Sequence, residues 1–441
     1  MTAAVTGRVP ARELIAAVAR GFTELPGRAG AAAVNGPIGW SGYDEARARA
    51  RERTGETEAV VCGIGDAGGT EAVLIAFEFG FLGGSIGEAT GERIENAFIT
   101  ARDLGLPVVS LIASGGSRMQ EGMFALTQLQ RIARQLVRLR AAGLAHLAVL
   151  AGPVTGGGWA TLGAGADVRV ALPGAQVGFA GSRIRPAGAD PRAYSAEGQF
   201  AVGQVDEIVP ARELGPAVAR WLALLTRPAP GPVPPPAALR EVPPPESGWQ
   251  AVTTAREAGR PRAESYLAAY FAERAPLGGT DPGILCGFGL RDGRSVAYVA
   301  QCGTATTPAG FRAATRLVRL ADRLSIPVLT LVDTPGAAND AEAERDGVGA
   351  AIADTITAVA GCRIPVTTLL VGEGGSGGAV ALTSPGHTWV TPDSYYSVVA
   401  PELAVAILKR GPDQVPFTAD ELRLRPQDLA ELGIARGIVS V

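Results

Sequence analysis

A length of 441 residues predicts two domains, or one large duplicated unit, because domains commonly span about 100 to 200 residues. The 40 Lys and Arg residues nearly balance the 43 Asp and Glu residues, so the formal net charge of −3 provides no basic field for nucleic acid or an anionic membrane. Hydrophobic residues make up 47% of the chain and charged residues 19%, which is too apolar for a disordered protein. The 59 glycines are about twice the usual share of roughly 7%, which predicts tight turns or close approach of a ligand to the backbone.

Cysteine and histidine are too sparse for a disulfide framework or a structural zinc site. There is no CxxC pair, and the four cysteines and two histidines lie far apart in the sequence: Cys62, Cys286, Cys302, Cys362, His146 and His387. The N-terminal stretch lacks the apolar core of a signal peptide, and no run approaches the 18 or so apolar residues of a membrane span. We therefore expect a cytoplasmic protein that binds no metal and has no nucleic-acid or membrane partner.

Apolar runs alternate with helical patterns through the first half of the chain, which is typical of an α/β fold. The predicted elements are a strand at 69–81, a helix at 94–105, a buried strand at 107–113, a long helix at 118–143 and a strand at 144–152.

A proline-rich segment predicts the domain boundary. Residues 227–250 hold nine prolines, which remove amide donors and favour extended geometry over helix or central strand. We expect an N-terminal domain at 1–226, a linker at 227–250 and a C-terminal domain at 251–441.

The second half of the chain repeats the first. Three pairs of segments match: PVVSLIASGG (107–116) with PVLTLVDTPG (327–336), GPVTGGG (152–158) with GEGGSGG (372–378), and LPGAQVGFAG (172–181) with TPDSYYSVVA (391–400). The first two pairs keep a constant offset of 220 residues, and the third is one residue out of step. Equal spacings between separate motifs seldom arise by chance, so we expect two copies of one fold.

In each copy, glycine-rich sequence follows an apolar strand. Glycine can adopt positive φ and turn its amides outward, so converging amides would make an anion hole. The two motifs of each copy lie 41 residues apart and are expected at successive strand ends, facing each other across one crevice. The facing residues would be Gly115 and Gly116 with Gly156, Gly157 and Gly158 in the first copy, and Gly336 and Ala337 with Gly377, Gly378 and Ala379 in the second. The alternative is that these glycines only make tight turns.

Other motifs narrow the chemistry. GIGDAG (63–68) satisfies GxGxxG, but a strand-like sequence follows it, which favours a hairpin over a dinucleotide site. Ser376 lies in a GxSxG pattern, yet the only later histidine is His387, which leaves no room for the usual acid of a serine hydrolase. What remains is catalysis by preorganised backbone amides, which suits a thioester enolate and a second oxyanion.

Longer motifs resemble a known family. SGGSRMQEG (114–122) and residues 152–183 are similar to the β half of the carboxyltransferase component of biotin-dependent acetyl-CoA carboxylase. DTPGA (333–337), GEGGSGGAVAL (372–382) and YYSVVAPELAVAIL (395–408) are similar to its α half. The resemblance implies two tandem crotonase-like (ClpP-like) domains, with the N-half of one protomer meeting the C-half of another at the active site.

The resemblance also implies an activity and its partners. Carboxylate would pass from N-carboxybiotin, carried on a separate protein, to the α-carbon of an acyl-CoA. The implied partners are the acyl-CoA substrate, a biotin carboxyl carrier protein, a biotin carboxylase and further copies of this chain, as a dimer or a trimer of dimers. Two alternatives remain open: a malonyl-thioester decarboxylase of the same fold, and a non-catalytic scaffold subunit.

Individual residues follow from the match. Gly115 and Gly116 match the amides of the N-half hole, and Gly378 and Ala379 those of the C-half hole. One hole would hold the thioester enolate oxygen, and the other the ureido oxygen of biotin. Ala381, at the position where acetyl- and propionyl-preferring members differ, resembles the acetyl type and favours malonyl-CoA as product, as in fatty acid biosynthesis.

Three further features complete these expectations. Arg183 is a candidate for contact with the CoA phosphates, whereas Arg118 is expected to cap or solvate the following helix. The four-cysteine zinc ribbon usual in bacterial β subunits is absent, and several acids occupy 338–347, where the family is more aromatic and glycine-rich. That second departure predicts an altered biotin pocket or substrate.

Overall fold

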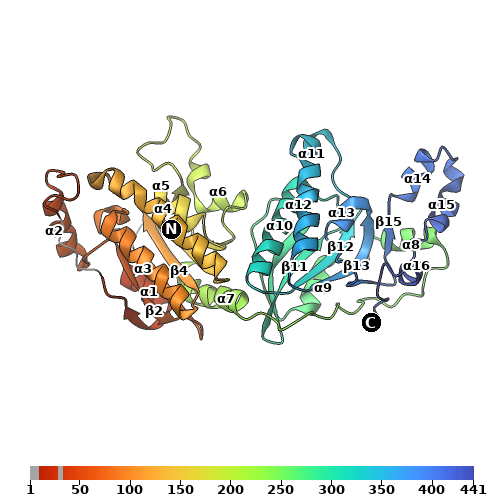
Figure 1. The fold of residues 1–441 in the computed structure, drawn as a ribbon. Helices are drawn as coiled ribbons and strands as arrows, with labels where there is room; N and C mark the ends of the chain where they lie inside the picture. The colour runs from red at the N-terminus through yellow and green to blue at the C-terminus, as the bar shows by residue number, and fades with distance from the viewer. Residues whose placement is uncertain (1–8, 28–32) are drawn as a thin grey trace, which may run out of the picture. The chain divides into compact units, whose positions relative to one another are not determined.

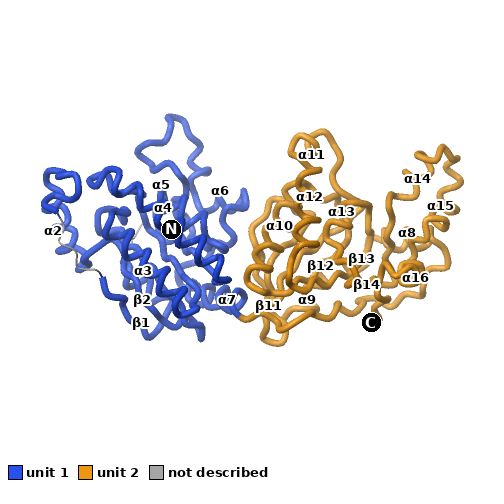
Figure 2. The backbone as a smooth tube through the Cα atoms, in the orientation of Figure 1, with its two compact units in different colours: residues 1–226 blue, residues 227–441 orange. Residues whose placement is uncertain are grey.

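The computed structural model describes residues 9–27 and 33–441 and divides the chain into two compact units, Met1–Thr226 and Arg227–Val441 (Figure 2). Each unit is an α/β structure built on one mixed sheet with helices packed against it (Figure 1). Within the described residues, no helix combines the length and apolarity needed to cross a bilayer.

The sheet of unit 1 has the order β1-β2-β3-β4-β5-β6-β8, and β7 pairs with the far end of β5. Its strands are β1 Arg20–Glu24, β2 Val60–Asp66, β3 Glu71–Phe77, β4 Val108–Ser114, β5 His146–Thr155, β6 Val168–Ala171, β7 Val177–Gly178 and β8 Glu207–Ile208. Strands β3 to β6 run parallel, whereas β2 and β3 form an antiparallel hairpin. The GIGDAG motif lies in that hairpin, as the sequence predicted.

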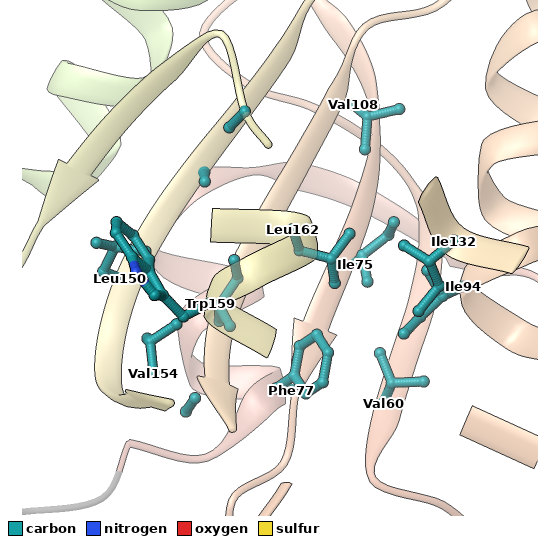
Figure 3. Close-up of a cluster of buried hydrophobic side chains, with 14 of the residues drawn as sticks. Val60, Ile75, Phe77, Ile94, Val108, Ile132, Leu150, Val154, Trp159 and Leu162 are labelled. Atoms are coloured by element: carbon teal, nitrogen blue, oxygen red, sulfur yellow. The ribbon is translucent and has the colours of Figure 1, made fainter. Parts of the chain in front are cut away.

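Alternate strand residues point to opposite faces of this sheet. Both faces are apolar, so helices can pack against each of them. The core on one face combines Ile75 and Phe77 of β3 with Ile94 of α3 and Ile132 of α4 (Figure 3). The helices of unit 1 are α1 Ala11–Val18, α2 Tyr43–Thr54, α3 Glu88–Leu104, α4 Met123–Ala141, α5 Gly156–Gly158, α6 Ala196–Ala201 and α7 Leu214–Thr226, with a π-helical turn at Trp159–Gly163. The predicted helix at 118–143 therefore starts later, at Met123, after a short 3-10 turn at Met119–Glu121.

The sheet of unit 2 has the order β14-β13-β12-β11-β10-β9, and β15 pairs with β13. Its strands are β9 Glu273–Pro276, β10 Ile284–Arg291, β11 Arg294–Gln301, β12 Val328–Thr334, β13 Val366–Gly375, β14 Thr388–Val390 and β15 Tyr395–Ser397. Its helices are α8 Gly248–Ala255, α9 Ala263–Tyr270, α10 Pro308–Arg323, α11 Ala341–Arg345, α12 Val348–Gly361, α13 Ser376–Val380, α14 Pro401–Ile407, α15 Val415–Glu421 and α16 Pro426–Glu431.

The central strands of the two units repeat each other. Strands β12 and β13 occupy the positions of β4 and β5, shifted by 220 residues at both ends. The pair Val154 with Val177 in unit 1 corresponds to Gly374 with Tyr396 in unit 2, which is the one-residue slip read from the sequence. The predicted duplication is confirmed.

The proline-rich segment 227–250 is part of unit 2 rather than a free linker. Val233 is buried in the unit 2 core, and its carbonyl accepts a hydrogen bond from Thr367 Oγ1 at 2.7 Å. The carbonyl of Pro234 accepts one from the Tyr270 hydroxyl at 2.7 Å. Prolines lack an amide donor but keep their carbonyl acceptors, so an extended proline run can still be bound along a domain.

Candidate active site

The loop after β4 is fixed by a bridge to Ile86. The carbonyl of Gly116 accepts from Ile86 N at 2.8 Å, and Arg118 N donates to Ile86 O at 2.9 Å. Ser117 lies between these two bonds, so its amide points away from Ile86. Within residues 9–27 and 33–441, the Ser117 amide has no hydrogen-bond acceptor.

The neighbouring glycine amides are already engaged. Gly115 N donates to Gly83 O at 2.9 Å, and Gly116 N donates to Ser114 Oγ at 3.2 Å. The structure thus corrects the expectation that Gly115 offers an open donor: a carbonyl from an earlier loop occupies that amide. Gly116 has φ +99°, the left-handed region that glycine tolerates, and so turns the next residue outward.

The second glycine loop of unit 1 packs against the first. A Cβ built on Gly116 would lie 3.4 Å from both Gly156 Cα and Gly157 N. Gly156 has φ +54°, while Gly157 and Gly158 lie in the first turn that follows β5, where amides have no acceptor within their own helix. The structure therefore brings together the residues that the sequence placed at successive strand ends.

Unit 2 repeats the first loop. Thr306 takes the place of Ile86: its amide donates to Gly336 O at 3.1 Å, and its carbonyl accepts from Ala338 N at 2.9 Å. Gly336 has φ +144° and donates to Thr334 Oγ1 at 3.1 Å. In the described part of the chain, the amide of Ala337 lacks an acceptor, as the amide of Ser117 does.

The second loop of unit 2 approaches Ala337 closely. A Cβ on Gly378 would clash with Ala337 N, so only glycine fits there. Gly377 is exposed with open space beside it, whereas Ala379 is fully buried. Ser376 has φ +52° and occupies the position that Gly156 holds in unit 1.

Ser376 and His387 lie far apart. The carbonyl of His387 accepts from Thr368 N, near the start of β13, whereas Ser376 follows the end of that strand. Between Thr368 and Gly374, β13 advances past four residues of β12, Thr330 to Thr334, which is about 13 Å along the sheet. Among the described residues, no hydrogen bond joins Ser376 to His387, so the serine-histidine pair that a hydrolase needs is not formed.

Two other predicted residues differ in accessibility. Ala381 is fully buried in a small cluster with Phe311 and Ala351, and Ala337 packs against that cluster. Arg183 is exposed and has no ion pair among the residues that the structure describes.

Arg118 is a buried ion-pair centre that sequence reasoning did not identify. Its side chain is fully buried, donates to Glu58 Oε1 at 2.5 Å and to Ser85 O at 2.8 Å, and pairs with Glu121 at 3.3 Å. Burial favours the neutral form of Glu58, but the charge and hydrogen bonds of Arg118 outweigh it, so the pKa of Glu58 lies below its ordinary value. Arg118 thus neither caps a helix nor faces solvent; it anchors the loop that carries Ser117.

Unit 2 also contains a buried ion pair, formed by Asp333 and Arg260. Asp333, a fully buried residue of β12, accepts from Arg260 Nη2 at 2.6 Å and from Glu373 N at 3.1 Å. Burial raises the pKa of Asp333 even though Arg260 opposes the shift. The bond to Glu373 ties the end of β12 to the strand that leads into the second glycine loop.

The acids at 338–347 do not build a metal site. Asp340 caps α11 by accepting from Glu342 N and Ala343 N, both at 2.9 Å, and Asp346 pairs with Arg312 at 2.7 Å. Throughout residues 9–27 and 33–441, no group of three or more His, Cys, Asp or Glu residues could hold a metal ion.

Comparison with known sequences decides the family. The family described as carboxyl transferase domain matches residues 40–207, and the family described as acetyl co-enzyme A carboxylase carboxyltransferase-like matches residues 245–440. The acetyl-coenzyme A carboxylase carboxyl transferase subunits beta/alpha of Saccharopolyspora erythraea is 36% identical over 430 residues, covering 90% of this chain and 74% of that protein. Its counterpart in Salinispora arenicola is 37% identical over 451 residues, covering 95% and 79%. The chain belongs to the acetyl-CoA carboxylase carboxyltransferase family.

Solved structures agree on the fold of this carboxyltransferase. Transcarboxylase 12S, with methylmalonyl-coenzyme A and methylmalonic acid bound, matches with a TM-score of 0.82 and 20% identity, covering 98% of this chain and 86% of that one. A single-chain, multi-domain long-chain acyl-CoA carboxylase matches with a TM-score of 0.79 and 20% identity, covering 98% of this chain and 45% of that one. Both units of the carboxyltransferase therefore have the predicted crotonase-like fold.

Family membership also settles the class of reaction. The carboxyltransferase is a biotin-dependent acyl-CoA carboxyltransferase, and its carboxyl donor is carboxybiotin carried on a separate protein.

Proposed function

We propose that this enzyme transfers carboxylate from carboxybiotin to the α-carbon of acetyl-CoA, giving malonyl-CoA, and that each unit supplies one backbone oxyanion hole. The observation that carries the proposal is the matched pair of open amides at Ser117 and Ala337. Each follows a glycine of positive φ and lies beside a second glycine loop. Donors placed in this way stabilise charge that develops only in the transition state, and one such donor is worth about 10²–10³ in rate.

In unit 1 the donors are the Ser117 amide and the amides of Gly157 and Gly158. Gly116 contributes by its conformation, because its amide is held by Ser114 Oγ. Contact between the two loops at Gly116 and Gly156 keeps these donors on one side. The hole is thus displaced along the chain from Gly115 toward Ser117.

In unit 2 the donors are the amides of Ala337 and Gly378. Ala379 is the fourth residue of α13, where the amide makes the first hydrogen bond of the helix, so the expectation that Ala379 is an open donor is corrected. Gly378 approaches Ala337 so closely that any side chain would force the two loops apart. Gly336 has the role of Gly116, and Gly377 leaves open space at the entrance to the loop.

The two holes divide the charge of the reaction. Carboxybiotin supplies the carboxylate, and its ureido nitrogen accepts the α-proton of the acyl group as the carboxylate leaves. The amides of one hole hold the thioester oxygen as it becomes an enolate oxygen, while those of the other hold the ureido oxygen. The enolate carbon then bonds to the released carboxyl carbon. No histidine takes part, consistent with the place of His387 beside Thr368.

Acetyl-CoA is the proposed acyl substrate on two grounds. The relatives named above are acetyl-CoA carboxylase subunits, and Ala381 keeps the position beneath Ala337 small and uncharged. Arg183, exposed and without an ion pair among the described residues, is the proposed contact for the CoA phosphates.

We also propose that the active enzyme is a homo-oligomer, a dimer or a trimer of dimers, in which the N-half of one protomer faces the C-half of another. Apolar side chains lie exposed near the proposed donors: Met119 is 74% exposed two residues after Ser117, and Val380 is 49% exposed two residues after Gly378. Such side chains favour contact with another protein surface. In this proposal the enzyme acts in the cytoplasm with a biotin carboxylase and a biotin carboxyl carrier protein.

The test runs the transfer in reverse, with malonyl-CoA as donor and free biotin as acceptor. Consumption of malonyl-CoA that depends on biotin, and exceeds that of methylmalonyl-CoA, supports the proposal. Consumption without biotin would instead identify a malonyl-thioester decarboxylase. Tight CoA binding with no turnover would identify a scaffold subunit.

A further inference from the structure

Gln301 connects the two glycine loops of unit 2. It is the last residue of β11 and is fully buried. Its Nε2 donates to Gly378 O at 3.0 Å and to Thr306 Oγ1 at 3.0 Å. Gly378 O can only accept, so the amide nitrogen of Gln301 must lie at that end of the side chain.

Both partners of Gln301 belong to the proposed hole. The backbone of Thr306 holds Gly336 and Ala338 on either side of the Ala337 amide. The Gly378 carbonyl belongs to the same peptide group as the Ala379 amide, and in a trans peptide these two groups point in opposite directions. A donor that holds this peptide group therefore fixes the first turn of α13, which carries the Gly378 amide.

Unit 1 shows that the fold does not require this polar contact. Strand register aligns Ala300 of β11 with Leu331 of β12, and Ala76 of β3 with Leu111 of β4, so Gln301 corresponds to Phe77. Phe77 is an apolar core residue (Figure 3), and Ile86 stands where unit 2 has Thr306. The same architecture is thus completed by an apolar pair in one unit and by a hydrogen-bonded pair in the other.

The Gln301 side chain also carries an unfavourable feature. In the part of the chain that the structure describes, its buried Oε1 has no hydrogen-bond partner. A buried acceptor without a partner lowers stability, and replacing such a group with an apolar one of similar shape can be neutral or stabilising. A residue kept for packing alone would not need this amide.

We propose that Gln301 is a positioning residue of the carboxyltransferase: it holds Gly378 and thereby sets the separation between the Gly378 and Ala337 amides. This inference rests on the proposed oxyanion hole of unit 2. Gln301 itself does not touch substrate.

The test compares Gln301→Met with wild type in the biotin-dependent assay with malonyl-CoA. Methionine keeps the length of the side chain but donates no hydrogen bond, so we expect kcat to fall about 10- to 100-fold through misaligned donors. KM for malonyl-CoA should stay within about threefold, because donors that act in the transition state contribute little to ground-state binding. The melting temperature should be unchanged or higher, since the unpartnered oxygen is removed.

Gln301→Glu adds a readout that a structural role would not change. An ionised carboxylate cannot donate to Gly378 O, whereas a protonated one can. We expect its kcat, relative to wild type, to rise as pH falls. Gln135→Met is the matched control, because Gln135 is 1% exposed and bonds Glu95 at 2.7 Å within the α3–α4 contact of unit 1. It should lose stability but not kcat.

Assaying Gly378→Val in parallel distinguishes failure of the proposed oxyanion hole from failure of the proposed role of Gln301. If Gly378→Val is inactive and Gln301→Met keeps the kcat of wild type, Gln301 has no positioning role while the hole stands. If kcat of Gln301→Met falls only in proportion to lost folded protein, its role is structural and the inference is overturned. If Gly378→Val retains activity, the hole itself is wrong.

Discussion

Gly116 and Gly336 make the same two contacts in the two units of the chain. Each has a positive φ, and each donates its amide to the hydroxyl of the residue two positions earlier, Ser114 or Thr334, at 3.2 and 3.1 Å. Each carbonyl accepts from a bridging residue, so the loop is held from both sides. Among the residues that the structure describes, the amide of the next residue in the chain has no acceptor, and the proposed chemistry depends on that amide.

Replacing Gly116 with Val tests this dependence. A Cβ there would make only ordinary contacts at 3.4 Å, so the cost comes from φ +99°, which a β-branched residue does not readily adopt. We expect kcat to fall at least about 10²-fold because the Ser117 amide is turned away. Stability should fall by only about 1–2 kcal/mol.

Gly174→Val is the control for Gly116→Val. Gly174 also has positive φ, +71°, but a Cβ there meets nothing within 4 Å. Its stability should fall similarly while kcat stays at the wild-type value. Equal activity in the two variants would contradict the backbone-hole mechanism.

The fold was largely predictable from local pattern. Strands β4 and β12 are mainly apolar runs that end in a hydroxyl residue, with a glycine one or two positions later, and the constant offset between them is enough to indicate the duplication. The proline-rich segment was predicted less well, because its binding to unit 2 depends on distant residues such as Thr367 and Tyr270.

The proposed donor in unit 1 lies one or two residues from the glycines that the sequence indicated. Glycine content pointed to Gly115, but in the described part of the chain the amide without an acceptor is that of Ser117, because Gly83 and Ile86 from an earlier loop engage this loop. Those partners lie about 30 residues away, beyond any local motif. The polar ending of β11 at Gln301, where β3 ends in Phe77, was the signal that an alignment of the two halves could have provided.

Removing the charge of Arg118 should destabilise unit 1 strongly. Arg118→Met leaves Glu58, 2% exposed, as a buried carboxylate without its cation, and such losses cost about 3–5 kcal/mol. Adding Glu58→Gln should recover part of that loss. Urea denaturation of the two variants and wild type measures both steps, and a single variant as stable as wild type would refute the assignment of Arg118 as the anchor.

The Arg118–Glu58 ion pair also predicts how the free energy of unfolding depends on pH. Since the pKa of Glu58 is lower in the folded state than its ordinary 4.5, its contribution to stability is complete above that value and disappears as pH falls through the folded pKa. Wild type should therefore exceed Glu58→Gln in unfolding free energy near neutral pH, and the difference should shrink below about pH 4.5. A difference that stays constant down to pH 3 would show that Glu58 is not ionised in the folded protein.

Ser376→Gly should keep full activity. Ser376 adopts φ +52°, and glycine occupies the equivalent place in unit 1, at Gly156 with φ +54°. Glycine relieves the positive-φ strain, which offsets its greater flexibility in the unfolded chain, so the melting temperature should change by only a few degrees. Because the hydroxyl has no proposed role, kcat of Ser376→Gly and of Ser376→Ala should stay within about twofold of wild type. Loss of activity in both would point to the hydroxyl as a reacting group.

His387→Phe should likewise leave turnover unchanged. His387 lies near the start of β13, where its carbonyl accepts from Thr368 N, about 13 Å along the sheet before Gly374. Phenylalanine can keep the edge contact with Trp389, whose ring centroid lies 5.7 Å from that of His387. Since the ureido nitrogen of biotin is the proposed proton acceptor, the pH profile of kcat for His387→Phe should superimpose on that of wild type. A 100-fold loss, or a missing limb in that profile, would make His387 the acid–base group and exclude catalysis by backbone donors and biotin alone.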